Sequence, residues 1–337
     1  MAKVREFGIG FENLHTREFV AHARRAEELG FGTFWIPEDP FYRGAFTVAS
    51  AIACSTSKVK IGLGVVNPFL RHPALTAMEF AALDEACNGR AILGIGAGLR
   101  DWIEGRLKIP YTQPTTAMRE TIEIIRRFFR GEEVTYPGRV FQTERIKLSF
   151  KPVRTEIPIY LGVLGPKNCE MTGKVADGLL LSVMSSPAYV KFAMEHVRRG
   201  LAKSGRDARD FSVGAYIFSS IAEDERVARD RIRPIVAIMI SLMAPQPNTP
   251  IFAAAGLPAE TIVKFGESFA QGKVPADMVT DEMIDTFTIA GSPSRCRENL
   301  ARLIEAGVTA PVFFEVPGMP PQQTMDDACR HLMPHFT

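Results

Sequence analysis

Cysteine is scarce in this chain, and its distribution excludes a disulfide-stapled scaffold. Only 5 cysteines occur among 337 residues, at Cys54, Cys87, Cys169, Cys296 and Cys329. Their number is odd and no two form a CxxC pair, a pattern unlike a disulfide framework or a zinc site. Scattered thiols are typical of a protein in the reducing cytoplasm. We therefore expect a cytoplasmic protein whose cysteines are free.

Long apolar runs are also missing, as is an excess of charge of either sign. No stretch approaches the roughly 18 apolar residues of a membrane-spanning helix. Residues 1–10 contain Lys3, Arg5 and Glu6 and do not resemble a signal peptide. The 40 Lys and Arg residues nearly balance the 38 Asp and Glu residues, for a formal charge of +2. That balance predicts neither a nucleic-acid partner nor a membrane partner.

The stretch from Lys60 to Gly98 has the pattern of a strand, a helix and a second strand. Ile61 to Val66 is an apolar run too short for a helix, closed by Asn67-Pro68. Pro73 to Cys87 carries apolar residues at helical spacing, and Ala91 to Ile95 is again a short apolar run. Strands that are apolar throughout indicate a parallel sheet covered on both faces.

Alternating strands and helices along the whole chain predict a (β/α)8 TIM barrel. Eight strands are expected, over Val4–Phe11, Thr33–Ile36, Ile61–Val66, Ala91–Ile95, Pro158–Gly162, Gly178–Val183, Phe211–Ser219 and Pro311–Val316. Such a barrel needs about 250 residues. The 337 residues of this chain are therefore expected to form one domain, residues 1–337, with insertions.

Two segments interrupt the alternation. Residues 133–150 contain a turn signal at Tyr136-Pro137-Gly138-Arg139 between two β-prone runs, which predicts a β-hairpin laid over the barrel. Residues 223–287 are rich in Met and Pro, follow the seventh strand and predict a helical insertion. The next helix is expected over Ala290 to Gly307, with Ser292 or Ser294 as its N-cap.

The sequence GLGVVNPFLRHPALTA followed by GRAILGIGAG resembles that of the bacterial-luciferase-like oxidoreductases. Within them it looks closest to the branch that uses the deazaflavin coenzyme F-420, which includes methylenetetrahydromethanopterin reductase. The resemblance is strong over Lys60 to Gly98, continues more loosely to about Val183 and returns near Gly291 to Val316.

The resemblance implies an enzyme that transfers a hydride between coenzyme F-420 and a small organic substrate, as a homodimer or a dimer of dimers. Three alternatives stay open: a reduced-FMN-dependent monooxygenase of the same fold, a folate- or methanopterin-type C1 reductase, and a non-catalytic flavin-binding relative. Insertion 223–287 has no motif that would identify the substrate.

In a TIM barrel the chemistry lies in the loops after the strands, at their carboxyl ends. The resemblance places a non-prolyl cis peptide at Gly64-Val65, whose backbone presses against the central ring of the cofactor. From the residues alone, the favoured interpretation is a glycine that packs closely inside a barrel strand. The other candidates for cofactor contact follow strands or lie at strand ends. They are Glu38, Asn67, Gly96, Gly98 and Ser182.

Asp39 and Glu12 are the candidate catalytic residues. Many relatives carry a His where this chain has Asp39, and a carboxyl group transfers protons near neutral pH only if its pKa is raised by burial. The methanopterin branch has an acidic residue aligned with Gly10, which argues against the C1 reductase, and Glu12 is the nearest carboxylate here. Glu38 and Asp39 could also serve only as loop or helix-cap residues.

Two further motifs bear on cofactor binding. Gly94-x-Gly96-x-Gly98 is not followed by a helix and so does not fit a dinucleotide fold. Leu164-Gly165-Pro166-Lys167 places a glycine and a proline at a helix start, which suits an anion. The resemblance implies a cofactor phosphate there, although Lys167 could be an ordinary solvated lysine. No metal site is expected, because Pro334 interrupts the spacing of His331 and His335.

Overall fold

Eight parallel strands form a closed barrel in the computed structural model, which describes residues 3–336. In order around the barrel they are β1 (Gly8–Gly10), β2 (Thr33–Ile36), β3 (Lys60–Val66), β4 (Ala91–Ile95), β7 (Ile159–Leu161), β8 (Gly178–Leu181), β9 (Ser212–Ile221) and β11 (Ala310–Phe314). β11 pairs again with β1 and closes the ring. The (β/α)8 barrel predicted from the sequence is confirmed, although the first strand is shorter than expected.

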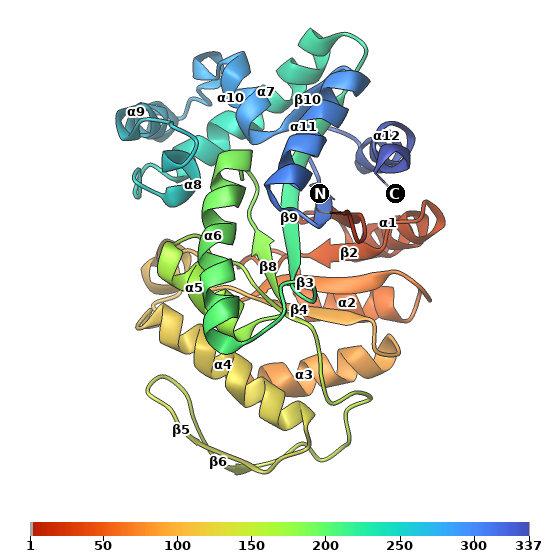
Figure 1. The fold of residues 1–337 in the computed structure, drawn as a ribbon, viewed down its shortest axis with the longest axis vertical. Coiled ribbons are helices and arrows are strands. Elements are labelled where there is room, and N and C mark those ends of the chain that lie inside the picture. The colour runs from red at the N-terminus through yellow and green to blue at the C-terminus, as the bar shows by residue number, and fades with distance from the viewer. Residues whose placement is uncertain (1–2, 337) are drawn as a thin grey trace.

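Helices surround this barrel (Figure 1). They are α1 (Thr16–Glu28), α2 (Ala45–Ala53), α3 (Pro73–Ala86), α4 (Pro114–Phe129), α5 (Pro166–Val175), α6 (Pro187–Ser204), α11 (Pro293–Ala306) and α12 (Pro321–His331), followed by the 3-10 turn η3 (Met333–His335). Proline at the first helical position of α3, α5 and α6 starts each helix where its missing N–H costs nothing.

The barrel interior is filled by aromatic rings that lie opposite glycines. Trp35, Tyr160 and Tyr216 belong to one buried cluster inside the ring of strands. A β-carbon added at Gly62 would lie 2.3 Å from the Trp35 side chain, and one at Gly178 would lie 2.7 Å from that of Tyr160. Glycine is therefore required where each ring crosses the neighbouring backbone.

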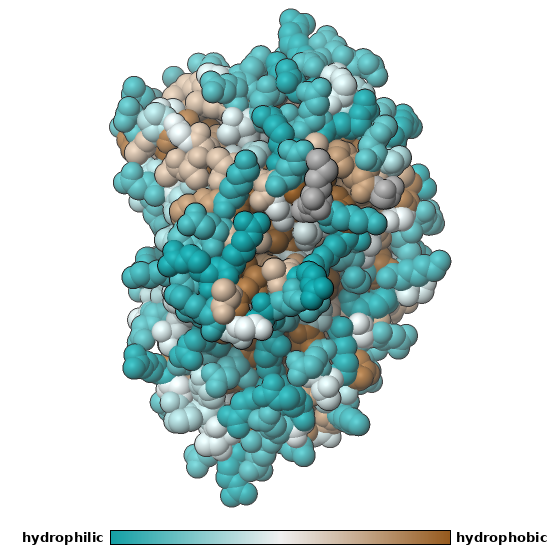
Figure 2. Space-filling view, viewed as in Figure 1, coloured by the Kyte–Doolittle hydropathy of each residue, from teal (hydrophilic) through white to brown (hydrophobic). Residues whose placement is uncertain are grey.

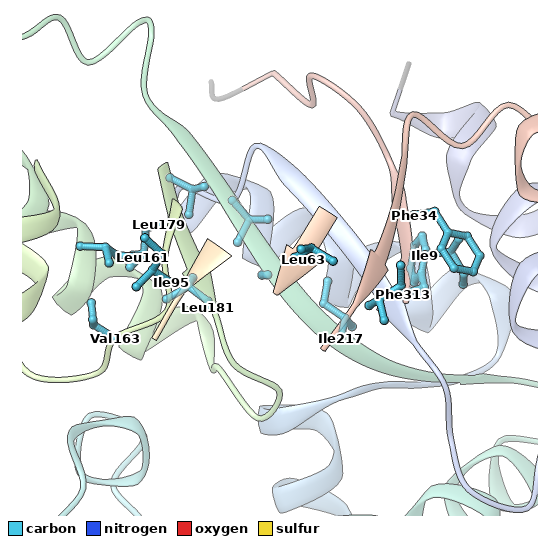
Figure 3. Close-up of a cluster of buried hydrophobic side chains, with 14 of the residues drawn as sticks. Ile9, Phe34, Leu63, Ile95, Leu161, Val163, Leu179, Leu181, Ile217 and Phe313 are labelled. Carbon is cyan, nitrogen blue, oxygen red and sulfur yellow. The ribbon is translucent and has the colours of Figure 1, made fainter. Parts of the chain in front are cut away.

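The other face of the same strands carries the larger apolar layer (Figure 3). Ile9, Leu63 and Phe313 are fully buried there, between strands and helices. Neighbouring residues on a strand point to opposite sides, so β3 places Leu63 outward and Gly62 and Gly64 inward. Burying each large apolar side chain contributes about 1.5–3 kcal/mol.

The hairpin is present, but it packs along the outer side of α4 rather than over the barrel (Figure 1). Its strands are β5 (Val134–Pro137) and β6 (Gln142–Ile146). Buried Glu120 of α4 accepts the backbone N–H groups of Arg139, Val140 and Phe141 at 2.8–3.0 Å. These three bonds lower the pKa of Glu120 against the effect of its burial and tie the hairpin turn to the helix.

The insertion after the seventh barrel strand is helical, as predicted. It contains α7 (Glu225–Leu242), α8 (Pro250–Ala253), α9 (Ala259–Ala270), the 3-10 turn η2 (Ala276–Met278) and α10 (Asp281–Phe287). One boundary was wrong: Ile289 to Gly291 forms β10, which pairs in parallel with the end of β9. The following helix therefore starts at Pro293 instead of Ala290, with Ser292 as its N-cap.

A π-helical turn over Asp101–Arg106 occupies part of the loop after β4.

Hydrophilic side chains cover most of the face in Figure 2, and apolar atoms gather at its upper left, over α8 and α9. Among the helices within residues 3–336, none has both the length and the apolar character needed to cross a membrane.

Candidate active site

Three carboxyl groups meet at the carboxyl ends of neighbouring strands. Glu12 follows β1, Asp39 follows β2 and Glu315 follows β11, and β1 pairs with both of the other strands. The Glu315 carboxylate accepts the backbone N–H groups of Glu12 and Asn13 at 2.9 and 3.0 Å. Glu315 thereby fixes the loop that carries Glu12.

The Glu12 carboxyl lies within hydrogen-bonding reach of the Asp39 carboxyl. Burial, followed by the hydrogen bond and the charge of Asp39 and then the charge of Glu315, raises the pKa of Glu12 to about 9. Two carboxylates cannot hydrogen-bond without a proton between them. At neutral pH Glu12 therefore carries that proton and can donate it.

Glu38 lies on the same rim but is engaged in holding loops. Its carboxylate accepts from Arg71 at 2.9 Å and from the Asn67 backbone N–H at 3.4 Å. Burial raises the pKa of Glu38, and the Arg71 guanidinium opposes that rise. The Asn67 side-chain amide in turn donates to the Ala97 carbonyl at 2.8 Å. Glu38 and Asn67 thus join the loops after β2, β3 and β4.

The end of β3 carries the expected irregularity. The Gly64–Val65 peptide bond is cis, and the pairing of β3 with β4 shifts register between Leu63 and Val66. A β-carbon added at Gly96 or Gly162 would lie 2.6 or 2.7 Å from the Val65 methyl groups. These glycines therefore let the strand ends approach Val65 closely.

An open, uncapped helix start lies at Gly165. This residue is the N-cap of α5, and no side chain caps the first turn. A β-carbon added at Gly165 would meet nothing within 4 Å, so free space borders the positive end of the helix. Leu164 accepts from the Tyr189 hydroxyl at 2.9 Å through its carbonyl, and Lys167 is exposed. This arrangement fits the phosphate of a cofactor.

Two other candidates lie at the same end of the barrel. Gly98 has a φ of +65°, and a β-carbon there would lie 2.5 Å from the Asn67 amide nitrogen, so its glycine is required by the local backbone. Ser182 follows β8, is exposed, and accepts the Ser185 hydroxyl on its carbonyl at 2.7 Å.

Sequence reasoning missed Glu315 and Tyr216. Both were placed inside predicted strands, where side chains were expected to be core. The Tyr216 hydroxyl donates to the Gly64 carbonyl at 2.8 Å, and Glu315 closes an otherwise apolar strand. A carboxylate at the end of an apolar run was the one signal that could have identified Glu315. Within residues 3–336, no set of three or more His, Cys, Asp or Glu side chains is arranged to hold a metal ion.

Comparison with known proteins places these features in a family context. Residues 7–310 match the luciferase-like monooxygenase family. The 5,10-methylenetetrahydromethanopterin reductase of Methanolobus tindarius is 34% identical over 90% of this chain and 92% of its own length. The enzyme of the same name from Archaeoglobus fulgidus is 35% identical over 90% and 91%. The solved coenzyme F420-dependent tetrahydromethanopterin reductase of Methanopyrus kandleri matches with a TM-score of 0.90, 27% identity and full coverage of both chains.

Proposed function

The chain belongs to the luciferase-like monooxygenase family, and on that basis we propose that it transfers a hydride between coenzyme F-420 and a small organic substrate. The name of the Methanopyrus kandleri reductase includes this cofactor and supports its assignment. The observation that carries the proposal is the meeting of Glu12, Asp39 and Glu315 at the carboxyl end of the barrel, where burial and the neighbouring carboxyls raise the pKa of Glu12 to about 9. Hydride transfer to a polar bond needs such a proton donor in reach of the heteroatom.

The residues that would hold the cofactor surround β3 and the start of α5. Gly64 and Val65 offer a backbone surface, and Gly96 provides the close approach beside it. Gly165 and Pro166 would receive the phosphate on the helix N-terminus, with Lys167 adding charge. When bound, the deazaflavin supplies the hydride chemistry, and the protein supplies orientation and a proton.

The charges around Glu12 favour reduction of a C=N group. The neighbours whose charges act on Glu12 are Asp39 and Glu315, both carboxyl groups. Negative charge stabilises a cationic electrophile such as an iminium and opposes the negative oxygen formed from a carbonyl. Glu12 would protonate the nitrogen of a neutral C=N group to give the iminium, and addition of a hydride to its carbon would yield the amine.

This chemistry supports a C1-type reductase, which was an alternative weakened by Gly10. Glu12 lies two residues beyond Gly10 and, beside Asp39, provides an acidic group at the strand end. The names of the two reductases at 34% and 35% identity point the same way.

A titration followed by deazaflavin absorbance, run beside FMN, tests the proposed cofactor. We expect coenzyme F-420 to bind with micromolar or tighter affinity, about 8 kcal/mol, and FMN to bind at least about tenfold more weakly. Preference for FMN with oxygen consumption would instead favour the monooxygenase. Binding of neither would favour the non-catalytic relative.

We also infer a cytoplasmic homodimer or dimer of dimers. The free cysteines support the reducing compartment.

On α3, Leu75 is 50% and Met78 43% exposed, so this helix offers apolar surface to a second copy. Analytical ultracentrifugation of Leu75→Glu checks the interface, because a charge there should release monomers. An unchanged sedimentation rate would exclude α3 from it.

A further inference from the structure

Tyr216 is a half-buried tyrosine of β9 that reaches across the barrel interior. Its ring lies edge-on to Trp35, with centroids 6.3 Å apart, and 4.9 Å from the ring of Phe314. Its hydroxyl donates to the Gly64 carbonyl at 2.8 Å. Burial raises the pKa of Tyr216 well above its ordinary value, so the hydroxyl keeps the proton that this bond uses.

The Gly64 carbonyl needs a partner from outside its own part of the sheet. β3 pairs with β2 only as far as Leu63, and its register with β4 shifts between Leu63 and Val66. Neither ladder therefore assigns a partner to Gly64. A buried carbonyl without a hydrogen bond is costly, and Tyr216 supplies that bond from a strand separated from β3 by β4, β7 and β8.

The contact also explains why residue 64 is glycine. A β-carbon added there would lie 2.4 Å from the Tyr216 hydroxyl oxygen and 2.7 Å from the Leu180 and Trp35 side chains. The hydroxyl thus occupies the space that a side chain at position 64 would need. Tyr216, Leu180 and Trp35 together support the backbone from inside the barrel.

We propose that Tyr216 is a positioning residue for the cofactor: its hydroxyl fixes the Gly64–Val65 backbone on which the cofactor ring rests. This inference rests on the proposed function, because that function places the ring on Gly64 and Val65. Tyr216 acts through the Gly64 carbonyl from the barrel interior. Its loss should therefore weaken cofactor binding, whereas the KM for the organic substrate should change little.

Tyr216→Phe removes only the hydroxyl, and Tyr160→Phe is its matched control. Tyr160 also points into the barrel beside Trp35, with centroids 5.9 Å apart, and its hydroxyl lies near Ser212, the first residue of β9. Both variants lose one tyrosine hydroxyl from the barrel interior, but Tyr160 lies near the opposite end of the barrel from Gly64 and its hydroxyl does not contact the Gly64 carbonyl.

Two measurements compare the variants: coenzyme F-420 affinity by absorbance titration, and amide hydrogen exchange of residues 60–70 in the cofactor-free protein. We expect Tyr216→Phe to weaken binding by about tenfold or more, equivalent to 1.4 kcal/mol, and to speed exchange at residues 64–67. Tyr160→Phe should change neither.

The two measurements, cofactor affinity and amide exchange, distinguish a failure of this inference from a failure of the proposed function. If the unmodified protein fails to bind coenzyme F-420, the cofactor assignment fails, and the exchange arm still decides whether Tyr216 fixes this backbone. If Tyr216→Phe matches Tyr160→Phe in both binding and exchange, the positioning role is overturned. If Tyr216→Phe folds poorly, Gly64→Ala, which displaces the hydroxyl from the other side, must speed the same exchange; unchanged exchange overturns the role.

Discussion

The Glu12 carboxyl at the end of β1 lies within hydrogen-bonding reach of the Asp39 carboxyl at the end of β2. A carboxyl pair of this kind holds one proton tightly, because two negative charges in contact repel each other. The resemblance noted in the sequence implies a His in many relatives where Asp39 stands. This chain keeps a transferable proton near neutral pH by burial and pairing instead.

Asp39→Asn should reduce turnover far more than stability. Asparagine keeps the size of the side chain but removes the charge and changes the proton arrangement of the pair, so we expect turnover to fall by about 10²-fold or more. Steady-state assays, a melting curve and an F-420 titration measure the effect, with Glu12→Gln as the companion variant. Normal turnover in both variants would show that Asp39 and Glu12 only stabilise their loops.

Glu315→Gln should move the alkaline limb of the pH–rate profile to lower pH. The Glu315 charge helps to raise the pKa of Glu12 to about 9, so its removal lowers that pKa and the donor loses its proton earlier. Asp39→Asn should move the limb further, because Asp39 contributes both a hydrogen bond and a charge. Profiles of kcat/KM from pH 6 to 10 test this order, and an unmoved limb in both variants would contradict it.

Glu12→Gln should stabilise the protein at alkaline pH. The pKa of Glu12 is about 9 when folded, against an ordinary value of 4.5, so the folded state binds more protons between these values and stability falls as pH rises through that window. Glutamine removes this loss, and we expect Tm at pH 8 to rise by about 2 °C with little change at pH 4.5. Exposed Glu298→Gln is the control, and equal curves for all three proteins would refute the expectation.

Gly165→Ala tests the phosphate site without disturbing the fold. The φ and ψ of Gly165, −85° and 157°, suit alanine, and the added methyl meets no protein atom within 4 Å. Tm should stay unchanged while F-420 binding weakens by about tenfold, or 1.4 kcal/mol. Lys167→Ala should weaken binding less. Lys174→Ala, on the same helix but paired with Glu170, should have no effect, and full affinity in Gly165→Ala would place the phosphate elsewhere.

Local sequence signals predicted most of the barrel. Each strand–helix unit is marked by a short apolar run and a helix start such as Pro73, features that act over a few residues. β10 was not predicted because Ile289 to Gly291 is too short to show the alternation of a strand and directly precedes a helix. The π-helical turn over Asp101–Arg106 has no comparable local signature.

The candidate site was predicted only where single residues follow strands. Glu12 and Asp39 could be named in this way, but their hydrogen bond depends on how β1 and β2 pair. Glu315 and Glu12 are separated by 303 positions in the chain, and Tyr216 and Gly64 by 152. Contacts over such separations arise from barrel closure and leave no local pattern in one sequence.

The position of Trp35 gives the protein a built-in optical reporter. It is one of 2 tryptophans in the chain, and its indole lies against Gly62 and Gly64, directly inside the backbone proposed to carry the cofactor. Indole emission overlaps the absorption of flavin and deazaflavin rings, so a ring seated on Gly64 would quench Trp35 by energy transfer. Trp102, in the π-helical turn, is the second emitter, and Trp102→Phe would leave a light signal that comes from the barrel interior alone.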